Sequence, residues 1–267
     1  MFKVHPSARC LIAAVPRKGV ATALVCAVMT LIPGWPVLAQ SPATPAPTFD
    51  KPVVVELFTS QGCSSCPPAD KLLAKIAHQP NVIAFSLPVD YWDYLGWKDT
   101  FASSGHTAKQ KGYSKTIGGS HVYTPQAVIN GVAQVIGSDS AALVKAANYA
   151  YGKHGALSVP LTVKTVGDTL VIDVGAGGGN ANLNLIKIAS SRTVDVGRGE
   201  NTGHQLVYTN VGRGIVRLGE WTGSAKRYEI ALSQVGGDDA DGWIVLLQSG
   251  EPGKPGAILA AAKSPNI

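Results

Sequence analysis

The stretch LFTSQGCSSCPPADKLL, residues 57–73, places two cysteines three positions apart, after an apolar run and before a helix-like pattern. The run before the cysteines, PVVVELF at 52–58, is continuous and rich in β-branched residues, which is typical of a strand buried on both faces of a sheet. The residues TSQGCSS then form a turn. The cysteine pair is therefore expected in the turn that leads from a buried strand into a helix.

A helix is predicted from about Cys66 to Ala77, because its apolar residues fall on one side. Pro67 and Pro68 fit its first turn, where a missing N–H group costs little. A second apolar run, NVIAFSLPV at 81–89, predicts the next strand. A strand, a helix and a strand in this order predict a parallel strand pair with a right-handed crossover.

Residues 1–39 have the layout of a secretory signal peptide: basic residues, an apolar run at 20–32, and small side chains before a cleavage site after Ala39. The apolar run is too short to span a bilayer as a helix, although an uncleaved anchor stays an alternative. This segment carries four Lys/Arg and no Asp/Glu, so its removal lowers the formal net charge from +6 to +2. We expect an exported, periplasmic or secreted protein, with no membrane attachment after signal cleavage.

Cleavage also removes Cys10 and Cys26, so Cys63 and Cys66 are the two cysteines of the mature chain. An exported protein meets an oxidising compartment, in which disulfides form and persist. A disulfide across so short a loop constrains the unfolded chain little, because the entropic benefit grows with loop length. Reactivity is therefore a better reason for this pair than stability.

The start of a helix gives such a pair its chemistry. Free N–H donors and a partial positive charge at a helix N-terminus both favour a thiolate. They lower a cysteine pKa from about 8.5 into the range of about 3.5–7.5. We expect Cys63 to be the nucleophile and Cys66, one turn further in, to be the shielded resolving thiol. This chemistry needs no metal or organic cofactor.

The chain then continues with an insertion and a second α/β segment. Residues 90–121 form the insertion, which opens on the aromatic loop DYWDYLGW. Residues 125–137 predict a hairpin around Asn130–Gly131, a strong short-range hairpin signal. Residues 138–151 predict a capped helix.

From about residue 156 onward, short runs alternate apolar and polar residues and are separated by Gly, Asn and Asp turns. They include HQLVYTN and GIVRLGEW, which are expected as two separate strands. This pattern predicts an antiparallel, all-β, sandwich-like domain. The predicted organisation is a signal peptide at 1–39, a Pro-rich tether at 40–50, an α/β domain at 51–153 and a β-rich domain at 154–267.

The order β-α-β, insertion, β-β-α around a C-x-x-C pair resembles the thioredoxin-like fold. In that fold a cis-proline opens the strand beside the cysteines, and VYTPQAVING resembles this element, with Pro125 as the proline. The resemblance implies that Thr124, just before it, offers its backbone to a bound peptide. Many members also carry a buried acid on the first strand, six residues before the nucleophile. Glu56 lies seven before Cys63, so it is the implied proton relay for Cys66 if the turn holds one extra residue.

Longer stretches narrow the resemblance. VVELFTSQGCSSCPPAD, PVDYWDYLGWKD, YTPQAVING and RGEN, followed by YTNVGR, look like a bacterial exported family catalogued as domain of unknown function 1223. The similarity runs over nearly the whole mature chain. It implies a thioredoxin-like domain and no established substrate.

Two further groups of side chains could serve the cysteine pair. The aromatic loop offers an apolar lip for a peptide substrate, or else packs the insertion on the sheet; its members are Trp92, Tyr94 and Trp97. A polar set lies around loops of the β-rich half: Arg198, Glu200, Asn201 and Arg213. We expect this polar set to seat the β-rich half on the first domain.

We therefore predict a thiol–disulfide oxidoreductase that acts on protein or peptide thiols and is served by an unidentified redox partner. One alternative is a Cu(I) carrier that uses both thiolates and a histidine, His106 or His121, because soft thiolates suit Cu(I). The other is a non-catalytic binding module with a passive disulfide. Nucleic acid is not expected as a partner, because no basic stripe is interleaved with aromatic residues.

Overall fold

The computed structural model describes residues 46–119, 121–237 and 239–267. The predicted signal peptide and most of the predicted tether lie outside the described residues. Within the described part of the chain, no helix is long and apolar enough to cross a membrane.

The first half has the element order that the sequence predicts, and its strands also pair in the predicted way. β1 pairs in parallel with β2 and antiparallel with β3, while β3 and β4 form the predicted hairpin. The insertion at 90–121 contains the helix α2. The elements are β1 (Val53–Thr59), α1 (Pro67–Ala77), β2 (Val82–Pro88), the 3-10 helix η1 (Asp93–Leu95), α2 (Ser104–Thr116), β3 (Gln126–Ile129), β4 (Ala133–Ile136) and α3 (Ser140–Ala150).

The second half is built mainly of antiparallel strands, as the alternating pattern predicts. Its elements are η2 (Lys153–Gly155), β5 (Leu161–Val166), β6 (Thr169–Val174), β7 (Ala181–Asp195), β8 (Gln205–Trp221), β9 (Lys226–Ala231), the short helix α4 (Leu232–Val235), β10 (Gly242–Glu251) and β11 (Lys254–Lys263). The two runs expected as separate strands form the single strand β8, which is 17 residues long. Glycines inside this strand are accommodated by irregular pairing with β7 near Gly212, rather than by a turn.

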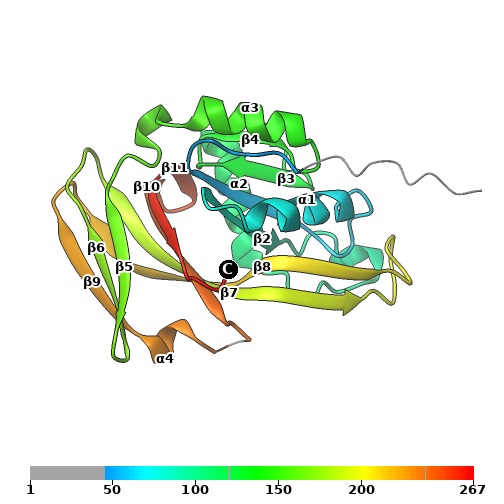
Figure 1. The fold of residues 1–267 in the computed structure, drawn as a ribbon. Coiled ribbons are helices and arrows are strands. Elements are labelled where there is room, and N and C mark those ends of the chain that lie inside the picture. Colours follow the sequence, from blue (N-terminus) through cyan, green and yellow to red (C-terminus); the bar gives the residue numbers. More distant parts are fainter. Residues whose placement is uncertain (1–45, 120, 238) are drawn as a thin grey trace, which may run out of the picture. The chain divides into compact units, whose positions relative to one another are not determined.

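The strands of the two halves share one sheet. Its order is β11-β10-β7-β8-β2-β1-β3-β4, and β5, β6 and β9 form a separate three-stranded sheet (Figure 1). The junction is the parallel contact of β2 with β8, where the Ser86 hydroxyl donates to Thr209 O at 2.9 Å and Asn210 Nδ2 donates to Ala84 O at 2.9 Å. The prediction that the β-rich half forms a sandwich by itself is therefore wrong, because four of its strands, β7, β8, β10 and β11, extend the mixed sheet. The boundary predicted at 153/154 falls inside η2, which lies between α3 and β5.

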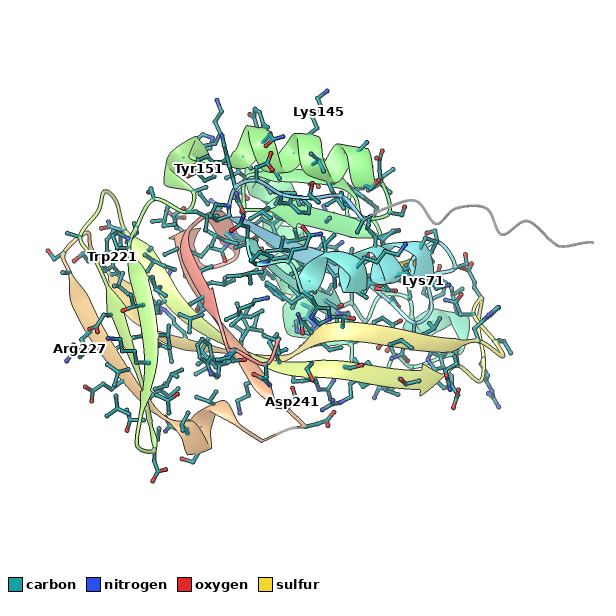
Figure 2. The ribbon with its side chains drawn as sticks, viewed as in Figure 1. Lys71, Lys145, Tyr151, Trp221, Arg227 and Asp241 are labelled. Atoms are coloured by element: carbon teal, nitrogen blue, oxygen red, sulfur yellow. A yellow bond between two sulfur atoms is a disulfide. The ribbon has the colours of Figure 1, made fainter. Side chains whose placement is uncertain are left out.

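Helices cover both faces of the mixed sheet. Leu73 of α1 and Leu143 of α3 pack with Val55 on one face of β1, whereas Tyr113 of α2 packs with Phe58 on the other face. Away from the helices, the three-stranded sheet packs against β7, β10 and β11 through a further apolar cluster. Trp221, which Figure 2 labels, is fully buried there.

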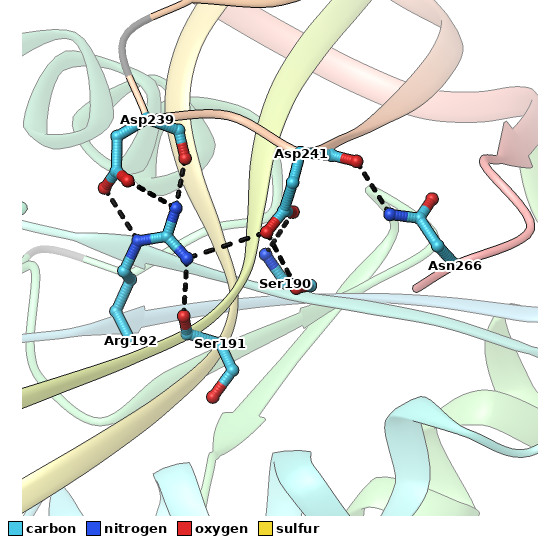
Figure 3. A network of polar contacts seen from close by, with 6 residues as sticks. All are labelled: Ser190, Ser191, Arg192, Asp239, Asp241 and Asn266. Atoms are coloured by element: carbon cyan, nitrogen blue, oxygen red, sulfur yellow. Dashed lines mark hydrogen bonds and ion pairs between the residues drawn. The ribbon is translucent and has the colours of Figure 1, made fainter.

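The segment after α4 is tied to β7 by a polar network (Figure 3). Arg192 Nε donates to Asp239 Oδ2 at 2.7 Å, and Ser190 N donates to Asp241 Oδ1 at 2.7 Å. Asn266 Nδ2 donates to Asp241 O at 2.7 Å, which joins the C-terminal segment to the same network. The Arg192 guanidinium lowers the pKa of Asp239 through this hydrogen bond. These contacts fix β7 beside the chain that leads into β10.

Candidate functional site

Cys63 and Cys66 form a disulfide in the turn between β1 and α1, with their Cα atoms 5.4 Å apart. Cys66 is the N-cap residue of α1, so the pair sits at the start of the helix, as the sequence predicts. The turn is closed by Cys63 N donating to Ser60 O and Cys66 N donating to Cys63 O, both at 3.2 Å. Both cysteines are buried, with Cys63 only 1% exposed.

The predicted proline lies beside this turn. The Thr124–Pro125 peptide bond is cis. Ser65 Oγ, between the cysteines, donates to Thr124 O at 3.5 Å, and Trp92 Nε1 donates to Thr124 Oγ1 at 2.8 Å. The structure thus brings Thr124, Pro125 and Trp92 to the cysteine pair.

Trp97 supports the turn from another direction. Its Nε1 donates to Gln61 Oε1 at 2.8 Å, and Gln61 N donates to Asp99 Oδ2 at 2.7 Å. Trp92 and Trp97 are both half-buried, so each has a packing role whatever it binds. Tyr94 is 77% exposed and stacks on Trp92, which makes Tyr94 the exposed part of the predicted lip.

Two members of the polar set reach the cysteine turn from the segment 196–204, which joins β7 to β8 and is called the tip below. Asn201 Nδ2 donates to Gln61 O at 2.9 Å and to Cys63 O at 3.0 Å. Ser64 N donates to Glu200 Oε2 at 3.1 Å, and hydrogen bonding from the Ser64 side chain, then from its backbone, lowers the pKa of Glu200. Arg213 instead lies over the ring of Phe101.

The structure does not bring Glu56 to the cysteines. Glu56 is fully buried, but it faces α2, where it accepts a hydrogen bond from Tyr113 and pairs with Lys109 Nζ at 2.8 Å. α1 packs on the opposite face of β1, because side chains alternate along a strand. The one-residue offset noted in the sequence thus places this acid on the far side of the sheet from Cys66.

A different buried carboxyl group belongs to the helix that follows the cysteines. Asp70, in the first turn of α1, is 4% exposed, and its backbone N donates to Cys66 O at 3.1 Å. Thr59 Oγ1 donates to Asp70 Oδ2 at 3.2 Å, while Asp70 Oδ1 is buried without a partner among the described residues. Burial raises the pKa of Asp70 to about 8. Asp70 also lines a cavity of about 410 Å³ that Ser64 helps to form.

The sequence carries a signal for Asp70 that its polarity hides. Cys66, Asp70, Leu73 and Ala77 follow the 4-3-4 spacing of a single helix face. Leu73 and Ala77 are buried on this face, so the acid between them and Cys66 must be buried too. Asp99 is a second such residue: burial raises its pKa although Gln61 N and Phe101 N donate to it. No comparable sequence spacing points to Asp99.

For the copper alternative, a histidine would have to lie beside the two cysteines, and the described residues do not place one there. Among the described residues, no three His, Cys, Asp or Glu side chains gather as a metal site would require. His121 is exposed, and His106 is buried on α2 with its Nδ1 at 2.9 Å from Pro88 O. Burial, with the charges of Lys109 and Arg213, lowers the pKa of His106 to about 4.

We expect His106 to make the fold sensitive to acid. Its pKa is about 4 when folded and about 6.5 when unfolded, so below pH 6.5 the unfolded chain binds the additional proton. The free energy of unfolding should therefore fall as the pH drops from 6.5 to 4, by at most about 3 kcal/mol from this residue. Urea unfolding of His106→Gln should show a weaker loss over this pH interval than the parent, whereas exposed His204→Gln should match the parent. An unchanged pH slope in His106→Gln would contradict the assignment.

Comparisons with known proteins identify a family and similar structures. A family model described as "Protein of unknown function (DUF1223)" matches residues 54–248. A crystal structure of an Agrobacterium tumefaciens protein is similar with a TM-score of 0.71 and 36% identity, covering 81% of this chain and 95% of that one. HBP35 of Porphyromonas gingivalis shares the fold, with a TM-score of 0.53 and 15% identity over 82% of this chain and 76% of that one.

A short sequence match adds to these. A protein of Archaeoglobus fulgidus named "Probable Thioredoxin" is 45% identical over 38 residues. The match covers 14% of this chain and 42% of that protein, so the chain spans less than half the length of this relative.

Proposed function

The chain belongs to the family described as protein of unknown function (DUF1223), and from that premise we propose that it is an exported thiol–disulfide oxidoreductase with a thioredoxin-like first half. Its substrates in this proposal are protein or peptide thiols, and a separate redox partner restores it after each turnover. The match to a protein named as a thioredoxin supports the proposal for the 38 residues that it covers.

One observation carries the proposal: the Cys63–Cys66 disulfide at the start of α1 lies beside the cis Thr124–Pro125 bond. The hydrogen bond from Ser65 Oγ to Thr124 O joins the two elements. These elements are far apart in sequence, and a stabilising staple would need only the first of them. A site that exchanges disulfides with a peptide needs both the sulfur atoms and a backbone edge that aligns the peptide.

The exchange balances without any other group. A substrate thiolate attacks Cys63 Sγ, a substrate–Cys63 disulfide forms, and the Cys63–Cys66 bond breaks with Cys66 leaving as a thiolate. A second substrate thiolate then attacks the substrate sulfur and releases Cys63. The substrate loses two electrons to the protein, and a disulfide of the redox partner takes them in the same way. The reverse sequence reduces a substrate disulfide.

Asp70 takes the proton-relay role that the sequence assigned to Glu56. It lies one helical turn beyond Cys66 and keeps one carboxyl oxygen without a partner among the described residues. A carboxyl whose pKa is raised to about 8 is neutral at pH 7 and can give its proton to the Cys66 thiolate as it leaves. Asp70 and Ser64, the residue that follows Cys63, line the same cavity.

The first test is the reduction potential of the pair. The full chain would be expressed with its own N-terminus, recovered after export, equilibrated in thiol buffers, alkylated and weighed. We expect a potential between about −120 and −270 mV, the range of exchanging pairs. A value below about −300 mV would match a passive structural disulfide and overturn the proposal. The same mass spectrum shows whether cleavage follows Ala39.

A further inference from the structure

The tip joins the second half of the chain to the cysteine turn. Glu200 and Asn201 contact Ser64 and Cys63 across sequence separations of 136 and 138 residues. The tip is itself well fixed, because Val196 N donates to His204 O at 3.0 Å and Gly203 N donates to Val196 O at 2.8 Å. A well-fixed element can hold its side chains against the pair in a constant position.

Backbone hydrogen-bond donors at the start of α1 are scarce. Pro67 and Pro68 have no N–H, and the N–H of Cys66 already donates to Cys63 O. Ser64 N, next to the predicted nucleophile, donates to the Glu200 carboxylate. The backbone donors of residues 66–68, which usually help to stabilise a thiolate at a helix start, are thus absent or engaged, and the side-chain hydroxyl beside the sulfur is Ser65 Oγ, 3.4 Å from Cys63 Sγ. A carboxylate beside Ser64 also disfavours a second negative charge on Cys63.

Asn201 acts on the same turn through the backbone. It is 5% exposed, and its amide nitrogen holds the carbonyl oxygens of Gln61 and Cys63 together. A side-chain amide that donates twice to one turn restricts the backbone on both sides of Gly62. This restriction keeps Cys63 in its buried position.

We propose that Glu200 and Asn201 are positioning residues for the Cys63–Cys66 pair, through which the β-rich half sets the redox equilibrium of the pair. The inference rests on the proposed exchange function and names two residues that set its redox equilibrium. Glu200 makes the Cys63 thiolate less stable, so it favours the disulfide and makes the protein a stronger reductant. The other ionisable residues that share the cavity with Ser64 are Asp70, Lys71 and His204.

The test compares two replacements of Glu200 with a matched control. Glu200→Gln removes the charge but keeps an acceptor for Ser64 N, whereas Glu200→Ala also frees the donor. Glu229→Gln, an exposed glutamate on β9, is the control. Each full-length variant is equilibrated with reduced and oxidised glutathione at pH 7, in which glutathione thiolate attacks Cys63, Cys66 leaves, and a second glutathione forms glutathione disulfide. The ratio of reduced to oxidised protein is then measured.

We expect Glu200→Gln to shift this ratio toward the reduced form by about two- to fivefold, because an exposed charge has a modest effect. Glu200→Ala should shift it by about tenfold, which corresponds to a potential about 30 mV less negative. The Cys63 thiol pKa, followed by thiolate absorbance, should fall in the same order. Asn201→Ala should speed reduction of the disulfide by dithiothreitol several-fold.

The possible failures are distinct. If the parent exchanges with glutathione but both Glu200 variants match Glu229→Gln in ratio and thiol pKa, the inference about the tip is wrong and the proposed function stands. If the parent stays oxidised in every glutathione buffer, the proposed function itself fails. A shift toward the oxidised form in the Glu200 variants would overturn the stated direction.

Discussion

Replacing Cys63 by serine is expected to abolish thiol–disulfide exchange, leaving only the rate of the uncatalysed reaction. A serine hydroxyl stays protonated at neutral pH and cannot form the mixed disulfide, whereas a thiolate is the nucleophile of every exchange step. Reduction of insulin by dithiothreitol, followed by turbidity, measures the loss. Ser224→Ala is the control, because Ser224 is exposed in the loop between β8 and β9 and lies outside the cysteine turn.

Cys66→Ser should behave differently from Cys63→Ser. Cys63 can still attack a substrate disulfide, but no second thiol in the pair resolves the product, so a mixed disulfide accumulates. Non-reducing gels of bacteria that express this variant should show protein adducts that disappear on reduction. Adducts of equal amount in Cys63→Ser would assign the nucleophile to Cys66 and reverse the proposed order. Full exchange activity in either variant would exclude the mechanism.

The first half could be predicted well from its sequence because its signals are local. A β-branched run, two prolines after Cys66 and an Asn130–Gly131 turn each specify one element, and their order specifies the parallel pairing. The cis bond before Pro125 followed from a family resemblance, not from the residues around it. The second half was harder, since period-two alternation identifies strands without saying which strands become neighbours.

The two misplaced features have physical reasons. The parallel contact of β8 with β2 depends on buried polar groups such as Ser86 and Asn210, which a hydrophobic pattern does not register. The distance of Glu56 from Cys63 along the chain nearly fits a place beside the cysteines, but successive side chains of a strand point to opposite faces of the sheet. The Lys109 ammonium and the Tyr113 hydroxyl compensate Glu56 on the α2 side, as a buried charge requires. The acid near Cys66 lies instead on the helix.

Asp70→Asn is expected to stabilise the oxidised protein, by an amount that depends on pH. The pKa of Asp70 is about 8 in the fold and about 3.9 in an unfolded chain, so between these values the folded state holds a proton that the unfolded state has lost. The free energy of unfolding is therefore unaffected by Asp70 ionisation below pH 3.9, and it falls as the pH rises from 3.9 toward 8. At pH 7 the loss is on the order of 4 kcal/mol. Asparagine resembles the neutral acid and removes this loss.

Urea unfolding of Asp70→Asn and the parent at pH 4 and pH 8 measures the difference. The variant should exceed the parent by several kcal/mol at pH 8 and by little at pH 4, because the unfolded Asp70 is then largely protonated. Asp168→Asn, in the exposed turn between β5 and β6, should show no such trend. In the exchange assay, Asp70→Asn should be slower and should lose the change in rate near pH 8. Equal stability of variant and parent at pH 8 would show that Asp70 is not a neutral buried acid, and the relay would have to be assigned elsewhere.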